Sequence, residues 1–311
     1  MAGPGRPSDH FDGRRFFNPE GPPPRGFLDV LRWKRTSRAQ PSPDFVSDNA
    51  TPEISAPPSP GETRITLINH STLLIETAGR TILTDPVWSF RVSPFSRFGP
   101  RRHRAPGIAL ADLPKIDLVL ISHNHYDHLD AGTLRLIAAR HSPRIIAPLG
   151  LRPLVQKLGF SKIQELDWWD EADSIFCVPA VHFSARSLFD RNQTLWCGYA
   201  FQTAAGLVYF AADTAFGGHF QQVRQRFGPP RVALLPIGAY EPRWFMSAVH
   251  MSPSEALEAH RVLEARESIG IHQGTFQLAD ENIDQPRVDL VRYQQTEVFR
   301  VPRNGETIRL S

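Results

Sequence analysis

The chain has 311 residues, 41% hydrophobic and 22% charged, which is typical of a soluble globular protein with a sizeable core. No apolar run approaches the ~20 residues of a membrane-spanning helix, and the first residues lack the apolar stretch of a signal peptide. We therefore expect a cytoplasmic protein, either free or held peripherally at the inner membrane surface. A formal net charge of +3 is weak support for nucleic-acid binding, so no nucleic-acid partner is predicted.

Residues 1–60 differ from the rest because they hold twelve of the 28 prolines. Proline removes backbone donors, and little apolar periodicity remains, so we expect a proline-rich arm that is partly disordered, above all at its start. Within it, GFLDVLRWKR (26–35) predicts a short helix with Phe27, Leu28, Leu31 and Trp33 on one side. This helix either packs on the main domain or lies on a membrane surface, with its basic residues toward lipid.

The main domain, residues 61–311, alternates between strand and helix patterns. Strands are predicted from β-branched and apolar runs at 63–77, 81–88, 117–122, 144–149, 174–184, 195–203, 206–214, 232–240 and 268–274. Helices are predicted at 131–141, 151–160 and 252–266, the last with Ser252 as N-cap and Glu255 completing a capping box. Paired strands, then strand–helix alternation, then more strands indicate an α/β protein whose sheets pack together with helices outside.

The stretch ISHNHYDHLD (121–130) places four metal-binding side chains within six positions, directly after an apolar strand. His123 and His125 can face the same way by the two-residue period of an extended chain. Asp127 and His128 follow one bend later and can face a second point close by. Imidazole and carboxylate are ligands that zinc, iron and manganese accept. The crowding of these groups therefore predicts a metal site.

Three further candidates also follow apolar runs: His182, Asp213 and His272. A lone histidine at such a place is often a hydrogen-bonded core residue, and a lone aspartate often forms a turn. With HNHYDH already present, however, they complete a set of seven ligands, enough for two ions with Asp213 between them. The remaining histidines considered are interpreted as surface or structural residues: His10, His103, His141, His219 and His260. The cysteines, Cys177 and Cys197, lack metal-type spacing and are interpreted as buried thiols.

These residues resemble a known family. HNHYDH after a strand resembles the HxHxDH signature of the metallo-β-lactamase fold, which implies an αββα sandwich with a metal site at one edge of the sheets. Other segments look like the N-acyl-phosphatidylethanolamine-hydrolysing phospholipase D family, from about residue 63 to about residue 285. They are INHSTLLIE, LTDPVWSFRVSPFSRFGPRR, APLGL, ELDWWDE, RFGPPRVALLPIGAYEPRWFM and IHQGTF. GAYEPRWFM together with ELDWW is the most specific part of this resemblance.

The resemblance implies a catalytic domain at 61–311 and a role for each site residue. One zinc would be held by His123, His125 and His182, and the second by Asp127, His128 and His272, with Asp213 bridging. His250 would lie near the substrate phosphate, so that Asp127, Asp213 and His250 are the implied catalytic residues. Asp85 would orient a ligand histidine. The implied cofactors are two Zn²⁺ ions, with iron or manganese as alternatives.

The sequence also departs from that family. It has Asn69 and Ala212 where glycine is common and Gln273 where tryptophan is common, and residues 184–194 match poorly. These differences change none of the predicted metal ligands, but they affect which substrate the resemblance implies.

The expected function is hydrolysis of a phosphodiester, with phospholipase D-type cleavage of N-acyl-phosphatidylethanolamines to phosphatidic acid and N-acylethanolamine. The alternatives are another hydrolase of this fold (a lactonase, a thioesterase or a cyclic or nucleotide phosphodiesterase) and a non-catalytic scaffold that retains its metals. The predicted partners are a phospholipid substrate, a membrane surface contacted peripherally, and a second copy of the chain in a homodimer.

Overall fold

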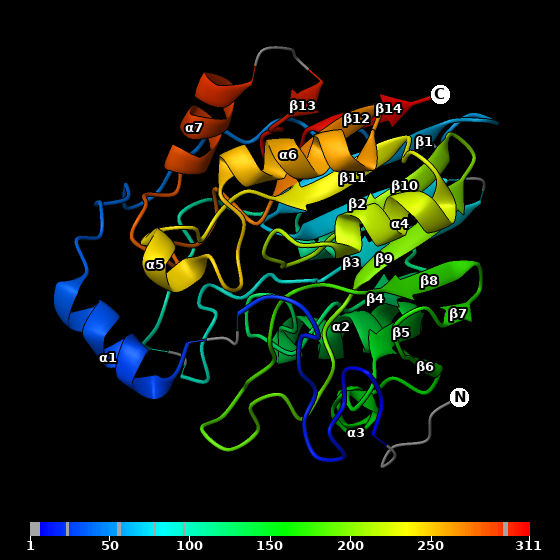
Figure 1. The fold of residues 1–311 in the computed structure, drawn as a ribbon. Coiled ribbons are helices and arrows are strands. Elements are labelled where there is room, and N and C mark those ends of the chain that lie inside the picture. The colour runs from blue at the N-terminus through cyan, green and yellow to red at the C-terminus, as the bar shows by residue number, and fades with distance from the viewer. Residues whose placement is uncertain (1–6, 23–24, 55–56, 78, 96, 295–297) are drawn as a thin grey trace.

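The computed structural model describes residues 7–22, 25–54, 57–77, 79–95, 97–294 and 298–311 (Figure 1). The predicted disordered start of the chain, at residues 1–6, lies outside these ranges. Two mixed seven-stranded sheets make up the centre of the main domain.

The first sheet has the order β14-β1-β2-β3-β4-β5-β6. Its strands are β1 (Thr63–Asn69), β2 (Thr72–Thr77), β3 (Arg80–Thr84), β4 (Leu118–Leu120), β5 (Arg144–Pro148), β6 (Ile163–Leu166) and β14 (Thr307–Leu310). Strands β3 to β6 are parallel to one another, whereas β14, β1, β2 and β3 pair antiparallel. β1, β2 and β4 are buried at every position. Of the three, only β4 (LVL) reads as a continuous apolar run, because β1 and β2 include polar residues.

The second sheet has the order β13-β12-β11-β10-β9-β8-β7. Its strands are β7 (Glu171–Ala172), β8 (Ile175–Val178), β9 (Gly198–Thr203), β10 (Gly206–Phe210), β11 (Val232–Pro236), β12 (Glu267–Ile271) and β13 (Phe299–Arg300). Strands β7 to β10 pair antiparallel, and β10 to β13 are parallel. The parallel strands β10, β11 and β12 therefore end at the same edge of the sheet.

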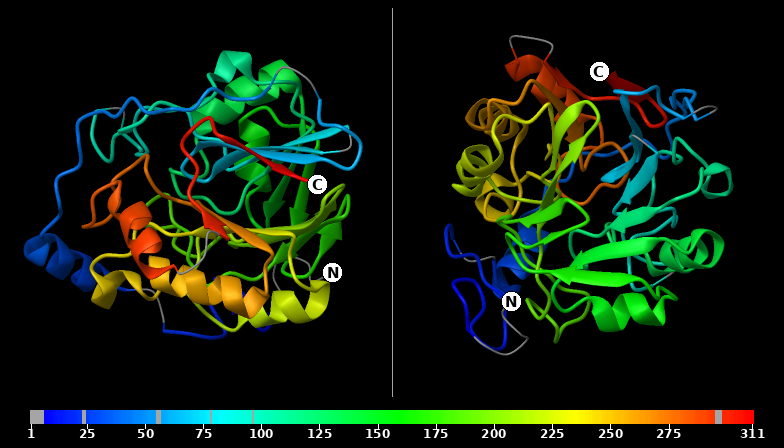
Figure 2. Two further views of the ribbon diagram at one scale, coloured as in Figure 1. Left: turned by 90° about the horizontal axis from the view of Figure 1, so that it is seen from above. Right: turned by 90° about the vertical axis from the view of Figure 1, so that its right-hand side faces the viewer.

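Helices cover the outer face of each sheet, as the views in Figure 2 show. They are α2 (Ala131–His141) and α3 (Arg152–Lys157) on the first sheet, and α4 (His219–Phe227), α6 (Pro253–Leu263) and α7 (Gln285–Tyr293) on the second. One apolar core lies between the sheets and one under each helical layer. The shorter α5 (Arg243–Met246), the 3₁₀ turn η1 (Leu110–Asp112) and α1 (Phe27–Thr36) complete the structure. The predicted αββα sandwich is confirmed.

Most predicted elements are present with shifted ends, and α6 begins with the expected Ser252–Glu255 capping box. The strand predicted at 63–77 is wrong in one respect, because the chain reverses at His70 and Ser71 and forms two strands, β1 and β2. No glycine or proline marks this turn. His70 itself takes a positive φ of 46° there, a conformation that glycine usually supplies.

The arm contacts the main domain at several places along its described length. Phe16 is buried in the core between the sheets. His10 reaches Asp167 with its Nε2 at 2.7 Å, and Val46 forms a bridge with Arg104. The arm is thus attached to the main domain through both side chains and backbone.

Helix α1 packs on the main domain chiefly through Trp33. Its indole donates a hydrogen bond to Asp280 at 2.9 Å and stacks on Phe245 of α5. The expectation that Trp33 shares a side with Leu31 is wrong, because side chains two positions apart in a helix point about 200° away from each other around its axis. Among the described residues, no helix is long and apolar enough to cross a membrane.

Candidate metal centre

The seven predicted ligands lie together at one edge of the two sheets, just beyond the ends of strands. His123 comes three residues after β4 and Asp213 three residues after β10. His272 follows β12 directly. The buried strands thus fix the backbone from which these side chains project, and the loops that follow them carry the chemistry.

The first group comprises His123, His125 and His182. The Nδ1 atom of His125 lies 2.9 Å from His123 Nε2 and 3.3 Å from His182 Nε2. Nitrogens that bind one tetrahedral zinc at about 2.0–2.1 Å are themselves about 3.3 Å apart, so the group has the size of a zinc site. Burial lowers the pKa of His125 to about 3 and that of His182 to about 4. These imidazoles are therefore neutral, the form that binds metal.

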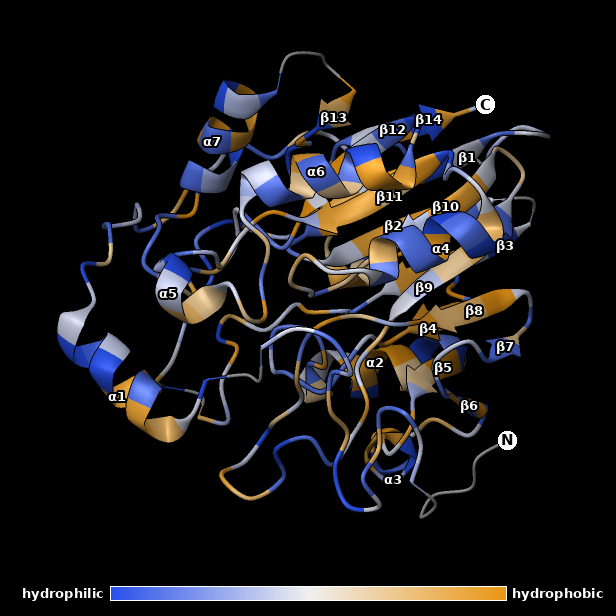
Figure 3. Ribbon diagram, viewed as in Figure 1, coloured by the Kyte–Doolittle hydropathy of each residue, from blue (hydrophilic) through white to orange (hydrophobic). Residues whose placement is uncertain are grey.

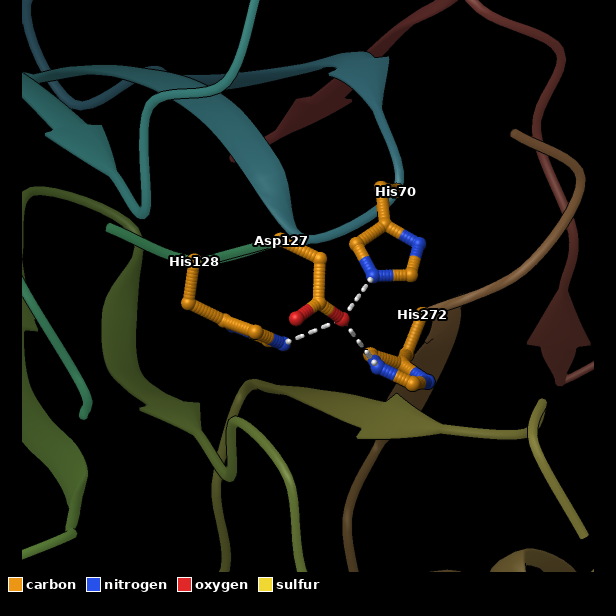
Figure 4. A group of neighbouring side chains, drawn as sticks. All are labelled: His70, Asp127, His128 and His272. Atoms are coloured by element: carbon orange, nitrogen blue, oxygen red, sulfur yellow. Dashed lines mark hydrogen bonds and ion pairs between the residues drawn. The ribbon is translucent and has the colours of Figure 1, made fainter. Parts of the chain in front are cut away.

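The second group surrounds one carboxylate oxygen (Figure 4). Asp127 Oδ2 lies 3.1 Å from His70 Nε2 and 3.4 Å from the Nε2 atoms of both His128 and His272. Figure 4 shows the three imidazoles turned toward this oxygen. His128 and His272 were predicted members of the group, whereas His70 was not.

His70 reaches this group because the turn between β1 and β2 lies at the same edge of the sheet. Its backbone N–H donates to Thr275 Oγ1 at 3.1 Å, and its carbonyl accepts from the N–H of His272 at 2.9 Å. The turn is therefore tied to the segment that carries another candidate ligand. The available signal was a histidine at the end of an apolar run, the same signal that identified His182 and His272.

Asp213 lies between the two groups. Its Oδ2 atom is 3.0 Å from His272 Nε2 and 3.2 Å from His128 Nε2. The same oxygen is 3.8 Å from His182 Nε2 and 4.0 Å from His123 Nε2. Despite these distances, His128 Nε2, His272 Nε2 and Asp213 Oδ1 make no hydrogen bond in the described structure. Buried polar atoms without such partners fit residues whose role is to hold an ion.

Two carboxylates set the charge of the centre. Burial disfavours the charged forms, yet the neighbouring imidazoles hold the pKa of Asp127 and of Asp213 well below the usual range. In return, the Asp213 and Asp127 carboxylates outweigh burial and raise the pKa of His272 to about 9 and that of His128 well above its usual value. The centre thus balances two negative charges with two positive ones, which cations can replace.

Asp85 is positioned to orient His128. Its Oδ2 lies 2.8 Å from His128 Nδ1, and its two oxygens accept hydrogen bonds from the N–H and hydroxyl of Ser122. An acceptor at Nδ1 keeps a proton on that nitrogen, so Nε2, which faces Asp127 and Asp213, is the nitrogen left to bind a metal. This is the arrangement expected of a carboxylate that supports a ligand histidine.

His250 lies beside both groups. Its ring centroid is 5.1 Å from that of His182 and 5.2 Å from that of His272, and its Nδ1 has no hydrogen-bond partner in the described structure. Burial, above all, lowers the pKa of His250 well below its usual value. His250 is therefore a neutral side chain at the rim of the centre, able to donate a single hydrogen bond.

Arg186 holds the loop that carries three of the candidate ligands, a role that no sequence pattern indicated. Its Nη1 donates to the carbonyls of Asn124 and Leu129, both at 2.8 Å. Its guanidinium lies 4.0 Å from the centre of the Tyr126 ring, and the Tyr126 hydroxyl donates to the Arg186 carbonyl. One side chain thus joins both ends of the 124–129 loop, and it comes from the segment that matches the expected family poorly.

Comparison with known proteins agrees with the fold. The family model of the beta-lactamase superfamily domain matches residues 80–273. An N-acyl-phosphatidylethanolamine-hydrolysing phospholipase D of Caenorhabditis elegans is 40% identical over 227 residues, which span 68% of this chain and 64% of that protein. A protein of Saccharomyces cerevisiae with the same designation is 36% identical over 224 residues, 68% of this chain and 47% of its own length.

Among solved structures, Igni18, a metallo hydrolase from Ignicoccus hospitalis, superposes with a TM-score of 0.61 at 23% identity, over 80% of this chain and 99% of Igni18. At that identity the likeness shows the fold alone. The expected resemblance to the phospholipase D family is confirmed by the nematode and yeast relatives, of which the chain spans about two thirds and about half. The chain belongs to the beta-lactamase superfamily.

Proposed function

We propose that the protein is a zinc-dependent phosphodiesterase that cleaves N-acyl-phosphatidylethanolamines in the manner of a phospholipase D, releasing phosphatidic acid and an N-acylethanolamine. The observation that carries the proposal is the position of Asp213 Oδ2, within 4.0 Å of imidazoles from both groups. A carboxylate shared by two ligand groups suits a pair of cations about 3.5–4 Å apart. The substrate is supported by the designation of the nematode and yeast relatives.

The residues of the centre have distinct roles in this proposal. When bound, two zinc ions would supply an ionised water at neutral pH and would neutralise charge on the phosphate. Asp127 and Asp213 would hold the ions. His250 donates its single N–H to a phosphate oxygen or to the departing alcohol oxygen. Its low pKa favours the first role, since a neutral imidazole is a poor acid.

The backbone links His250 to the first group. The Nδ1–H of His182 donates to the carbonyl of Val249 at 3.0 Å, and Val249 immediately precedes His250. This hydrogen bond orients His182 with its Nε2 toward Asp213 and fixes the segment that presents His250. The phosphate contact and the candidate ligand are thus positioned together.

A lipid substrate implies contact with a membrane surface, and α1 fits that role. Phe27, Leu28 and Leu31 are 68%, 79% and 50% exposed, although each is a large apolar side chain. Figure 3 shows that α1 projects from the body of the molecule. Arg32 lies over the ring of Trp244 on α5, so a basic residue borders this surface. Apolar side chains beside cationic ones suit an anionic lipid surface.

Vesicle sedimentation with paired variants tests the membrane contact. Phe27→Ser with Leu28→Ser should reduce binding to anionic vesicles at least fivefold. Val288→Ser with Val291→Ser is the matched control, because these side chains are 56% and 57% exposed on α7. Equal binding by both double variants would show that α1 does not contact the membrane. That result would leave the proposed phosphodiester hydrolysis untouched.

An activity panel on the zinc-loaded protein tests the reaction itself. N-acyl-phosphatidylethanolamine in detergent micelles should be split at the phosphodiester, and lactones and thioesters should be poor substrates. Asp213→Asn should lower the rate by at least a thousandfold, whereas Asp112→Asn in η1 should leave it unchanged. Rapid cleavage of another ester class with the lipid left intact would refute the substrate, and an active Asp213→Asn protein would refute the mechanism.

A further inference from the structure

His70 belongs to the second group by distance, but distance alone leaves two roles open. Its Nε2 lies 3.1 Å from Asp127 Oδ2, compared with 3.4 Å for the Nε2 atoms of His128 and His272 (Figure 4). Two atoms bound to one zinc ion are about 3.3 Å apart, so all three spacings fit ligands of a shared ion. A separation of 3.1 Å also fits a hydrogen bond from an imidazole N–H to a carboxylate oxygen. His70 is therefore either a further ligand or a hydrogen-bond donor.

The contacts of Asp213 distinguish these two roles. The Nε2 atoms of His128 and His272 lie 3.2 Å and 3.0 Å from Asp213 Oδ2. Among the described residues, Asp127 is the only carboxylate within 4.0 Å of a ring nitrogen of His70. His70 thus approaches Asp127 without approaching the carboxylate that the candidate ligands share. This placement favours a contact with Asp127 itself over a contact with an ion held between Asp127 and Asp213.

The surroundings of Nδ1 also bear on the role of His70. A histidine that binds metal through Nε2 carries its proton on Nδ1 and usually donates it to an acceptor, as His128 does to Asp85. His70 Nδ1 is buried and has no hydrogen-bond partner in the described structure. A proton there would be buried without an acceptor, whereas a proton on Nε2 meets a carboxylate. His272 also lacks a partner at Nδ1, but its contact with Asp213 places it among the ligands.

The His70 ring is held in place by the turn and by its neighbours. Its backbone N–H donates to Thr275 Oγ1, and its carbonyl accepts from the N–H of His272. The ring centroid lies 4.1 Å from that of His272 and 5.4 Å from that of Phe276. A ring fixed in this way presents Nε2 at one position, as a group that orients a neighbouring carboxylate must.

We propose that His70 is a positioning residue for Asp127. Its Nε2–H donates to Asp127 Oδ2 and fixes the orientation of the carboxylate, which keeps other lone pairs for an ion. Asp127 belongs to the second group and not to the first. Loss of this hydrogen bond should therefore weaken the binding of one zinc ion and spare the other. The inference rests on the zinc centre of the proposed function and is independent of the substrate.

Two substitutions of His70 separate donation from ligation. Glutamine places an amide N–H near the position of the imidazole Nε2–H, whereas asparagine is too short to reach Asp127. Asparagine readily adopts the positive φ of this turn, so the backbone should be retained. In chelator competition on the full chain, His70→Asn should bind the second zinc 10- to 100-fold more weakly and the first zinc as before. His70→Gln should retain most of the affinity, and the control His260→Asn, on α6, should retain all of it.

Heteronuclear NMR of the cadmium-loaded chain, with isotope-labelled histidine rings, identifies the ligands without reference to any activity. Ring nitrogens that bind cadmium show scalar coupling to the metal. His70, assigned by the absence of its signal from His70→Gln, should show a protonated Nε2 and no such coupling.

Three results would overturn the role of His70 and leave the proposed function standing. They are coupling of His70 Nε2 to cadmium, equal affinities for the second zinc in His70→Asn and the unaltered chain, and an affinity in His70→Gln as low as that in His70→Asn. An unaltered chain that binds no zinc would overturn this inference and the proposed function together.

Discussion

The carboxylate of Asp85 accepts a hydrogen bond from His128 Nδ1 at 2.8 Å, although Asp85 is not itself a candidate metal ligand. Because it keeps the proton on Nδ1, we expect Asp85→Asn to weaken zinc binding about 10- to 100-fold. Asparagine tolerates the positive φ of 34° at this position, so the backbone should be retained. Competition with a chromogenic chelator measures the affinity.

The exposed Asp112→Asn variant provides the control for that experiment, since it removes one negative charge at a distance from the centre. Equal zinc affinities for Asp85→Asn and Asp112→Asn would show that Asp85 does not position His128.

Zinc binding should release protons from the centre. In the metal-free protein the pKa of His272 is raised to about 9, chiefly because the Asp213 carboxylate outweighs the effect of burial, so His272 is protonated at pH 7.5. A metal needs the neutral imidazole, and about one to two protons should leave when zinc binds. Zinc affinity should therefore rise as the pH rises toward about 9 and level off above it.

Calorimetric titration of the metal-free protein with zinc at pH 7.5, in two buffers of different ionisation enthalpy, measures this release. His260→Gln, which lies on α6 away from the centre, should release the same number of protons. Identical heats in the two buffers would mean that His128 and His272 are already neutral before the metal arrives.

The main features of the fold could be predicted because they depend on local pattern. Strands buried on both faces read as unbroken apolar runs, and α6 carries its own N-terminal signals in Ser252 and Glu255. HNHYDH could be recognised because its four candidate ligands lie within six positions of the sequence. His182 and His272 needed the additional expectation that strand ends meet at one edge of the sheets.

His70 was missed for the same reason that β1 and β2 were predicted as a single strand. The residues at the turn, Asn69 to Thr72, are polar, but they are buried and include neither glycine nor proline, so the run 63–77 was predicted as one strand. Without the reversal, His70 would lie within a strand rather than at its end. The side of α1 on which Trp33 lies was also predicted wrongly. Tertiary contacts with Phe245 and Asp280 decide which side of the helix faces inward, and the local sequence does not show them.

Arg186 should be a positioning residue for the 124–129 loop. Arg186→Met removes both hydrogen bonds to the Asn124 and Leu129 carbonyls, and it leaves those buried acceptors unpaired. We expect zinc affinity and kcat to fall at least tenfold, with KM little changed. Lysine can satisfy one carbonyl but cannot lie flat on Tyr126, so Arg186→Lys should recover only part of the loss.

The visible spectrum of the cobalt-substituted protein reports the geometry of the site independently of rate. It should change in Arg186→Met, return partly in Arg186→Lys, and stay unchanged in Arg191→Met, whose guanidinium bonds to the arm instead. An unaltered spectrum in Arg186→Met would show that Arg186 does not set the geometry of the metal site and contributes only to the stability of the fold.

His10 should make attachment of the arm dependent on pH. Its Nδ1 lies 2.5 Å from Asp9 and its Nε2 2.7 Å from Asp167, and a neutral imidazole has only one N–H for two carboxylates. Burial alone would lower the pKa of His10, but the two carboxylates outweigh it and raise the pKa above 6.5. The stabilisation is therefore fully present below pH 6.5, the value for the unfolded chain, and is lost as the pH rises through the higher folded value.

Thermal unfolding of the unaltered chain and of His10→Gln, measured from pH 6 to alkaline pH, tests whether the stabilisation by His10 depends on pH. The variant should be less stable by about 1–2 kcal/mol at pH 6, because hydrogen bonds to charged groups are lost from a buried ring, and the difference should shrink at alkaline pH. Limited proteolysis should release the arm of the unaltered chain faster at high pH, and that of His10→Gln at a rate that varies little. A stability difference that stays constant or grows with pH would mean that His10 is neutral in the folded protein and attaches the arm through its contact with Trp168 alone.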